Sequence, residues 1–151
     1  MRLIKLAVIL ALAFALNNST HAASPSIKKV LPQFIDAKGR NSLSPSLYER
    51  DAYQLLLRNH PEQRSGLRFA ILWSAPRGKA LVLRVELRGA KGDNLDTIKL
   101  DASVKKMGWF SRWSSLELRG EDYQKFGDLV AWRATLWDGE KQMAQQQSFL
   151  W

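Results

Sequence analysis

Four residues in the second half of the chain combine aromatic rings with a guanidinium group: Trp109, Phe110, Arg112 and Trp113. They follow a turn at residues 105–108, in a segment that begins as a loop. Exposed aromatic faces stack on sugar rings, and a neighbouring arginine can hold an anionic group. The sequence therefore offers these four residues as the candidate ligand-binding site. The alternative is that Trp113 belongs to the core and Trp109 or Phe110 seals one end of the domain, since most tryptophans of small domains are largely buried.

Residue types that perform other chemistry are sparse. The sequence has no cysteine, and His60 is the single histidine beyond residue 22, so neither a histidine-rich metal site nor a thiolate nucleophile can be built. His60 stands beside Pro61 in no nucleophile motif, which is typical of a surface histidine. No glycine-rich phosphate loop or nucleotide fingerprint is present. We expect no metal and no cofactor.

A pair of carboxylates is the one catalytic device that remains open, since the chain has 14 acidic residues. None of them stands in an apolar sequence context that would raise its pKa. Glu86 and Asp101 fall in the middle of predicted strands, on outward faces, where pairing with Arg84 or Lys99 is the simpler explanation. We therefore expect a protein that is not an enzyme, with a small carboxylate-based hydrolase as the least favoured alternative.

Alternating apolar and polar residues predict most of the elements that must position these side chains. The pattern is clear in residues 67–73, 81–88, 98–104 and 130–137, and a first strand is expected at 27–31, interrupted or ended by Pro32. With a short strand around residues 116–118 and a return strand at the end, the total is six or seven strands. Short strands separated by turn signals favour an antiparallel sandwich or barrel.

One helix is predicted near the N-terminus, at about residues 46–59. Ser46 and Glu49 have the spacing of a capping box, and His60-Pro61 ends the helix. An apolar stripe runs along one side of it, through Tyr48, Ala52, Leu55 and Leu56. We expect this stripe to pack over an open face or end of the sheet. Residues 120–127 are expected to be a loop with a single helical turn, with Tyr123 and Phe126 as plugs.

The last 26 residues predict a β-hairpin that turns at Asp138-Gly139, which would place Trp137 opposite Glu140. Its return strand contains three consecutive glutamines, residues 145–147, and is expected to be a polar edge strand. Trp132 and Trp137 fall on opposite faces of the outgoing strand. We expect the helix to cover Trp137; a contact surface at Trp137 is the alternative.

This arrangement resembles an all-β, immunoglobulin-like sandwich of the fibronectin type III kind, with one inserted α-helix near the N-terminus. The resemblance rests on strand spacing and on Trp132, which lies where such sandwiches often keep a large aromatic residue. The paired cysteines of true immunoglobulin domains are absent. A sandwich fold by itself implies no activity.

The N-terminus predicts export. Residues 1–5 carry two positive charges, residues 6–16 are apolar, and a short polar stretch ends in small residues, which together are typical of a cleavable signal peptide over residues 1–22. Cleavage after Ala23 and an uncleaved anchor are the alternatives. Residues 23–151 are then a single β-sandwich domain that is periplasmic or secreted, with no transmembrane segment after cleavage.

The charge of the chain narrows the class of partner. The formal net charge is +9, and +7 remains once Arg2 and Lys5 leave with the signal peptide. Such a balance favours anionic surfaces, although the basic residues are spread along the chain and can serve solubility alone. We expect a non-catalytic module that binds a protein or an anionic cell-surface component, and no nucleic acid. A glycan-binding module that uses the aromatic and arginine loop is the alternative; oligomeric state stays open.

Overall fold

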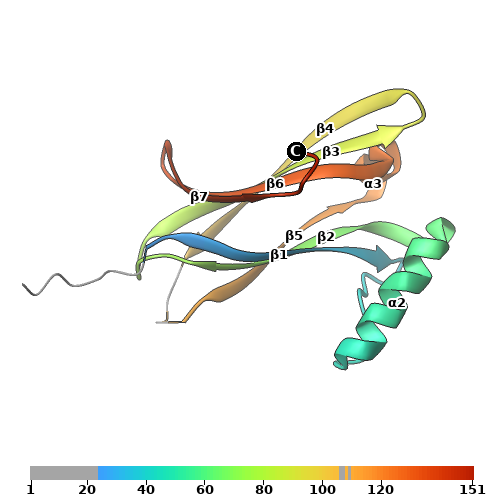
Figure 1. Cartoon of the computed structure of the whole chain (residues 1–151), viewed down its shortest axis with the longest axis horizontal. Helices are drawn as coiled ribbons and strands as arrows, with labels where there is room; N and C mark the ends of the chain where they lie inside the picture. The colour runs from blue at the N-terminus through green and yellow to red at the C-terminus, as the bar shows by residue number, and fades with distance from the viewer. Residues whose placement is uncertain (1–23, 106–107, 109) are drawn as a thin grey trace, which may run out of the picture.

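The computed structural model describes residues 24–105, 108 and 110–151 as two antiparallel sheets packed face to face (Figure 1). The three-stranded sheet has the order β1-β2-β5, and the four-stranded sheet has the order β4-β3-β6-β7. The all-β, two-layer antiparallel architecture predicted from the sequence is thereby confirmed. The strands are β1 (Ser26–Asp36), β2 (Arg64–Ser74), β3 (Ala80–Lys91), β4 (Asn94–Lys105), β5 (Arg112–Arg119), β6 (Asp128–Asp138) and β7 (Lys141–Gln147).

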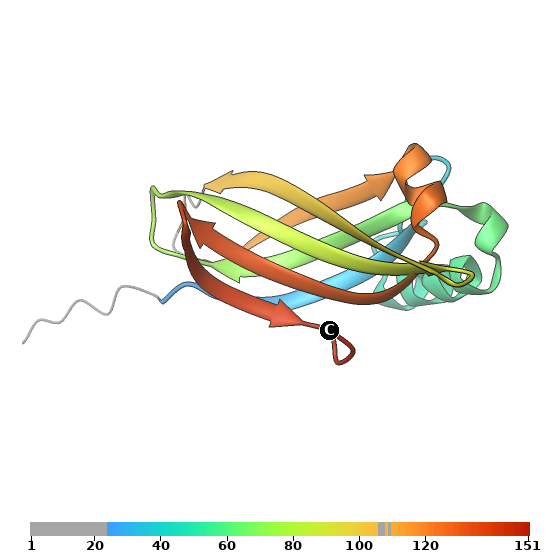
Figure 2. The ribbon, with the colours of Figure 1, turned by 90° about the horizontal axis from the view of Figure 1, so that it is seen from above.

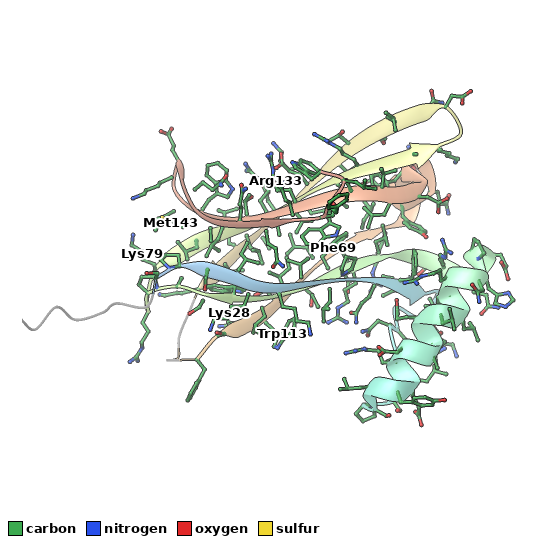
Figure 3. All side chains as sticks on the ribbon, viewed as in Figure 1. Lys28, Phe69, Lys79, Trp113, Arg133 and Met143 are labelled. Atoms are coloured by element: carbon green, nitrogen blue, oxygen red, sulfur yellow. The ribbon has the colours of Figure 1, made fainter. Side chains whose placement is uncertain are left out.

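The core lies between the two sheets and is built from the inward side of the alternating pattern. β2 contributes Leu67, Phe69, Ile71 and Trp73, and β3 contributes Leu81, Leu83, Val85 and Leu87, all nearly or fully buried. Figure 3 shows Phe69 pointing into the space between the layers. Because side chains alternate across a strand, these rows leave the polar residues of β2 and β3 on the two outer faces.

Strand β1 runs further than predicted, because it continues through Pro32 to Asp36. The prediction that Pro32 interrupts or ends the strand is wrong. β1 is an edge strand that pairs only with β2 in its sheet, and at an edge a proline can leave its missing N–H on the unpaired side.

Helix α2 (Leu47–Asn59) agrees closely with the predicted helix, but its N-terminus does not form the capping box. Ser46 occupies the N-cap position without a side-chain hydrogen bond to the helix. Its backbone carbonyl accepts from the N–H of Arg50 instead, at 3.0 Å. A 3₁₀ turn, η1 (Pro61–Gln63), follows α2, and the short helix α3 (Gly120–Phe126) holds the buried Phe126 as predicted.

The final hairpin forms, but its turn is shifted by one residue. Asp138 pairs with Lys141, so Gly139 and Glu140 are the two loop residues, and Trp137 pairs with Gln142 rather than facing Glu140. Gly139 has φ +58°, whereas no non-glycine residue of the described chain has positive φ. A turn with glycine at its first central position needs positive φ at that residue alone. Asp138, which the predicted turn would have placed at positive φ, therefore avoids that strained conformation. β7 is an edge strand, as predicted, and β6 lies between β3 and β7.

The predicted signal peptide, residues 1–22, lies outside the described residues. The helices that the structure describes are all too short or too polar to cross a membrane. Export and the boundaries of the mature domain stay predictions.

Candidate functional site

The predicted aromatic cluster ends in the first residues of β5, where Trp113 lies on the outer face of the three-stranded sheet. Trp113 pairs with Leu72 of β2, and 49% of its surface is exposed. Figure 3 shows it on the side of this sheet that faces away from the other layer. The alternative that Trp113 is a core residue is therefore wrong. Leu116 and Leu118 point inward, so alternation places Trp113 and Ser115 outward.

Trp73 is a core tryptophan and is fully buried, and Trp132 is partly buried against the same core. The indole Nε1–H of Trp73 donates to Oγ of Ser114 at 2.9 Å. Ser114 thus takes the inward position next to Trp113 and satisfies the one polar atom of the buried ring.

The other members of the cluster do not converge on Trp113 as a closed site. Phe110 is 89% exposed. Arg112 is also exposed and donates from Nη1 to the backbone carbonyl of Lys105 at 2.9 Å, which ties the start of β5 to the end of β4. Trp109 lies outside the described residues.

A groove that the sequence did not reveal runs from Trp113 along the outer face of the three-stranded sheet. We call it the Trp113 groove; its volume is about 290 Å³. It brings together side chains from β1, β2, β5, the segment before α2, and α2 itself: Leu31, Gln33, Asn41, Arg50, Arg68, Ala70, Trp113 and Ser115. No motif links these positions, because they become neighbours only when the three strands pair and α2 docks.

The polar side chains of the Trp113 groove are held in place by one another. Arg68 donates from Nε and Nη2 to Oγ of Ser115 at 3.2 and 3.1 Å, and its Nε lies 3.7 Å from a carboxylate oxygen of Glu117. Asn41 donates to the side-chain oxygen of Gln33 at 2.9 Å. The two charged residues that line the groove, Arg50 and Arg68, are both cationic. Each guanidinium has a carboxylate nearby, since Arg50 donates to Asp51 at 2.9 Å and Arg68 lies 3.7 Å from Glu117. A half-exposed indole beside guanidinium and amide groups suits a sugar whose carboxylate or sulfate bonds to the donors that these pairs leave free.

Helix α2 presents the second unusual feature, because its apolar side faces solvent. We call this side the α2 apolar face; it comprises Leu43, just before the helix, and Leu47, Tyr48, Ala52, Leu55 and Leu56. Tyr48 is 83% exposed, Leu47 67% and Leu55 55%. A shallow hollow of about 290 Å³ lies between Leu43, Ala52 and Leu56. The predicted stripe through Tyr48, Ala52, Leu55 and Leu56 was expected to pack on the sheet, and this is wrong, because all four residues are exposed.

The reason is that α2 is docked by polar contacts on its other side. Gln54 accepts from the backbone N–H of Phe34 at 2.8 Å and donates to the carbonyls of Phe34 and Asn41 at 2.9 and 2.8 Å. Tyr53 donates its hydroxyl hydrogen to Asp36 at 2.7 Å, and Leu57 is the one fully buried residue of the helix. Gln54 satisfies the backbone N–H and carbonyl of Phe34 in β1. The side of α2 that faces the sandwich is therefore set by hydrogen bonds and not by the apolar stripe.

Asp36 is the centre of this joint between β1 and α2. Its carboxylate accepts from the backbone N–H groups of Lys38 and Arg40 at 2.9 and 2.8 Å, from Nε of Arg40 at 2.8 Å, and from Tyr53. Burial acts to raise the pKa of Asp36, but the hydrogen bonds from Arg40 and Tyr53 outweigh it and hold that pKa far below its usual range. The group stays ionised and anchors the helix.

Trp137 lies on the outer face of the four-stranded sheet and is not covered by α2. The helix contacts β1 and η1 at the opposite end of the molecule from the β6–β7 turn, as Figure 2 shows. The expectation that α2 covers Trp137 is wrong, because the helix leaves the sandwich on the side of the three-stranded sheet. Trp137 is half-buried and borders a separate hollow.

The described carboxyl groups show no sign of tuning for acid catalysis. Asp36, Glu62 and Asp101 have a clearly shifted pKa, and in each case the shift is downward, whereas a catalytic acid needs a raised one. His60 is exposed, with Nδ1 3.2 Å from Glu62. Within residues 24–105, 108 and 110–151, no group of three potential metal ligands comes together.

Comparison with known proteins adds no assignment to this geometry. No family model matches the chain, and no curated protein or solved structure matches it either.

Proposed function

We propose that this chain is an exported, non-catalytic binding module with an immunoglobulin-like sandwich of the fibronectin type III kind. The grouping of its strands supports that fold. The fourth strand, β4, lies in the same sheet as β3, β6 and β7. In constant-type immunoglobulin domains the fourth strand lies in the sheet of the first, second and fifth strands, so the chain differs from that type. The predicted signal peptide supports export, and the lack of tuned acids or metal-ligand groups among the described residues favours binding over catalysis.

The partner that the geometry supports best is a protein that docks on the α2 apolar face. A surface helix normally turns its apolar stripe to the core and its polar stripe to water. α2 does the reverse, since Gln54 and Tyr53 face the sandwich while Leu47, Tyr48 and Leu55 face solvent. Exposed apolar patches of this kind mark interaction sites. This inverted helix is the observation that carries the proposal.

A photo-crosslinking residue at position 55 tests the docking face directly. We expect it to capture one defined protein from an envelope extract, and the same residue at position 95 to capture none. Leu95 is a matched control, because it is 81% exposed and lies in the β3–β4 hairpin, away from α2. The purified partner should then lose affinity by about tenfold or more for the Leu47→Ser, Leu55→Ser double variant, since buried leucine contacts of this size contribute about 1 to 2 kcal/mol each.

The proposal is wrong if position 55 yields no specific crosslink at low and at moderate salt. It is equally wrong if the double variant binds the captured protein as tightly as the original chain does. Both leucines are exposed, so the variant is expected to fold normally, and its unfolding curve checks this.

A second candidate function is binding of an anionic glycan in the Trp113 groove. The observation that favours it is the half-exposed indole of Trp113 beside the cationic Arg50 and Arg68. Titration with acidic and neutral polysaccharides, followed by tryptophan fluorescence, tests it. We expect binding to acidic polymers that weakens with salt and is lost in Arg68→Gln but kept in Lys141→Gln, a change on the other sheet. An unchanged spectrum across the panel rules this function out.

A further inference from the structure

The outer face of the four-stranded sheet contains a second hollow, which no motif in the sequence indicates. We call it the Trp137 hollow; its volume is about 470 Å³. It is bordered by Trp137 from β6, Arg84 and Val82 from β3, Asp101 and Ser103 from β4, and the Gly139-Glu140 turn. It lies on the opposite side of the sandwich from the Trp113 groove and is far from α2.

The side chains that border this hollow are fixed before any ligand arrives. The indole Nε1–H of Trp137 donates to Oγ1 of Thr135 at 2.8 Å, and Thr135 is 1% exposed, so the orientation of the ring is anchored in buried structure. Arg84 and Asp101 form a two-bond pair across β3 and β4, Nε to Oδ1 at 2.7 Å and Nη2 to Oδ2 at 2.8 Å. A ligand therefore binds to side chains that are already ordered, and little conformational entropy is lost on binding.

The Arg84–Asp101 pair still has hydrogen-bonding capacity toward solvent. The two side chains are 28% and 43% exposed. Of the five N–H donors of a guanidinium and the roughly four lone-pair sites of a carboxylate, two on each side are used in the pair. The remaining donors and acceptors stand side by side next to the indole. Adjacent hydroxyls of a sugar both donate and accept, so they match this arrangement.

The charges around the hollow decide between classes of sugar. Arg84 and Asp101 neutralise each other, and the hydrogen bonds from Arg84 hold the pKa of Asp101 below its ordinary value. Glu140 is the other charged residue at the border. The residues that line the hollow therefore offer no unpaired cation to a carboxylated or sulfated sugar; Lys99, which also acts on Asp101, is not among them. The guanidinium of Arg84 lies over one face of the Trp137 indole, 5.5 Å from the ring centroid, so a ligand can stack only on the other face of the ring.

We propose that the Trp137 hollow is a binding site for a neutral hexopyranose segment of a polysaccharide. The apolar C–H face of the sugar ring stacks on the face of the Trp137 indole that Arg84 does not cover, and hydroxyls at the edge of the sugar bond to the Arg84–Asp101 pair. The site is independent of the α2 apolar face and of the Trp113 groove, and each can exist without the other.

Two-dimensional ¹H–¹⁵N NMR of the purified protein, titrated with neutral hexaoses of glucose, mannose and N-acetylglucosamine and with an acidic oligogalacturonate, tests the proposal. The chain has six tryptophans, and the spectrum of Trp137→Phe identifies the indole signal of Trp137. We expect at least one neutral hexaose to shift that signal saturably, and the acidic oligomer to leave it unchanged.

Four variants locate the binding. Trp137→Ala is expected to weaken it by about tenfold or more, and Trp137→Phe by less, because a smaller aromatic ring remains. Ser103→Gln is exposed and projects a longer neutral side chain into the hollow, so it should block binding even if Trp137→Ala folds poorly. Leu95→Ala, at the far hairpin, should bind normally.

The proposal is overturned if no neutral hexaose shifts the Trp137 signal. It is also overturned if binding survives both Trp137→Ala and Ser103→Gln, or if the acidic oligomer binds as well as the neutral ones.

Discussion

Replacing Asp36 with asparagine removes the negative charge at the joint between β1 and α2. The asparagine carbonyl can still accept from the two backbone N–H groups that Oδ1 accepts in the original chain. Its NH₂ group, however, takes the place of Oδ2 and faces the guanidinium of Arg40, where two donors then oppose each other. Hydrogen bonds to charged groups contribute about 1.5 to 3 kcal/mol each.

Because Arg40 is 45% exposed while Asp36 is 10% exposed, solvent screens part of that energy. We expect Asp36→Asn to lower the free energy of unfolding by about 2 kcal/mol, which is roughly 6 to 10 °C in Tm for a domain of this size. Urea unfolding at neutral pH, followed by tryptophan fluorescence, measures this loss. Asp93→Asn, in the exposed β3–β4 turn, is the control and should change stability by less than about 0.5 kcal/mol.

The difference in the free energy of unfolding between the original chain and Asp36→Asn should also depend on pH. The folded-state pKa of Asp36 lies below its ordinary value of 3.8, so its contribution is complete above that value and is lost as pH falls through the folded-state pKa. The difference between the original chain and Asp36→Asn should therefore be constant from about pH 5 to 8 and should shrink below about pH 4. A difference below about 0.5 kcal/mol at pH 7, or one that is equal at pH 7 and pH 2.5, would refute this account of the joint.

Four further substitutions test the packing of the sandwich and the conformation of its last turn by urea unfolding. Trp151→Ala removes a ring that lies 4.1 Å from the guanidinium of Arg88 and 4.7 Å from that of Arg133. We expect the free energy of unfolding to fall by about 1 to 2 kcal/mol. An unchanged midpoint would mean that this stacking contributes nothing. Trp73→Ala should lower the free energy of unfolding by about 3 to 5 kcal/mol, because the ring is fully buried. Trp113→Ala should lower it by less than about 1 kcal/mol, because that ring is 49% exposed. Equal losses would contradict the register of β5. Gly139→Ala should cost about 1 kcal/mol because Gly139 has φ +58°, and full stability would contradict the shifted turn.

The strands and their inward faces were predictable because they depend on local alternation. Leu81, Leu83, Val85 and Leu87 read as one face of a strand, and all four are buried. The same reasoning failed for α2. Its apolar stripe was visible in the sequence, but the side that docks is chosen by Gln54 and Tyr53, whose partners on β1 are about 20 residues away in the chain. A hydrogen bond to a distant backbone has no periodic signature.

The candidate binding residues likewise divide into those that the sequence indicated and those that only the folded structure brings together. The sequence indicated Trp113 and Arg112 as possible binding residues, and the structure finds both exposed. It did not indicate Arg50 and Arg68, which come from α2 and β2 and line the groove beside Trp113. The pairing of Asp101 with Arg84 was expected from the sequence and is confirmed. The Trp137 hollow beside that pair was missed, because Trp137 is brought to it only through the register of β3 with β6.

By itself, the sequence determined the all-β class of this protein, the approximate position of its helix, the shortage of catalytic side chains and the presence of exposed-aromatic candidates. These follow from composition and from periodicities of two and 3.6 residues, which each segment carries alone. Only the tertiary structure decided which side of α2 meets water, that Trp113 and Trp137 lie on opposite outer faces, and which charged residues stand beside each of them. Those outcomes depend on strand pairing and on hydrogen bonds between distant segments, because cross-strand neighbours are set by register and not by distance along the chain.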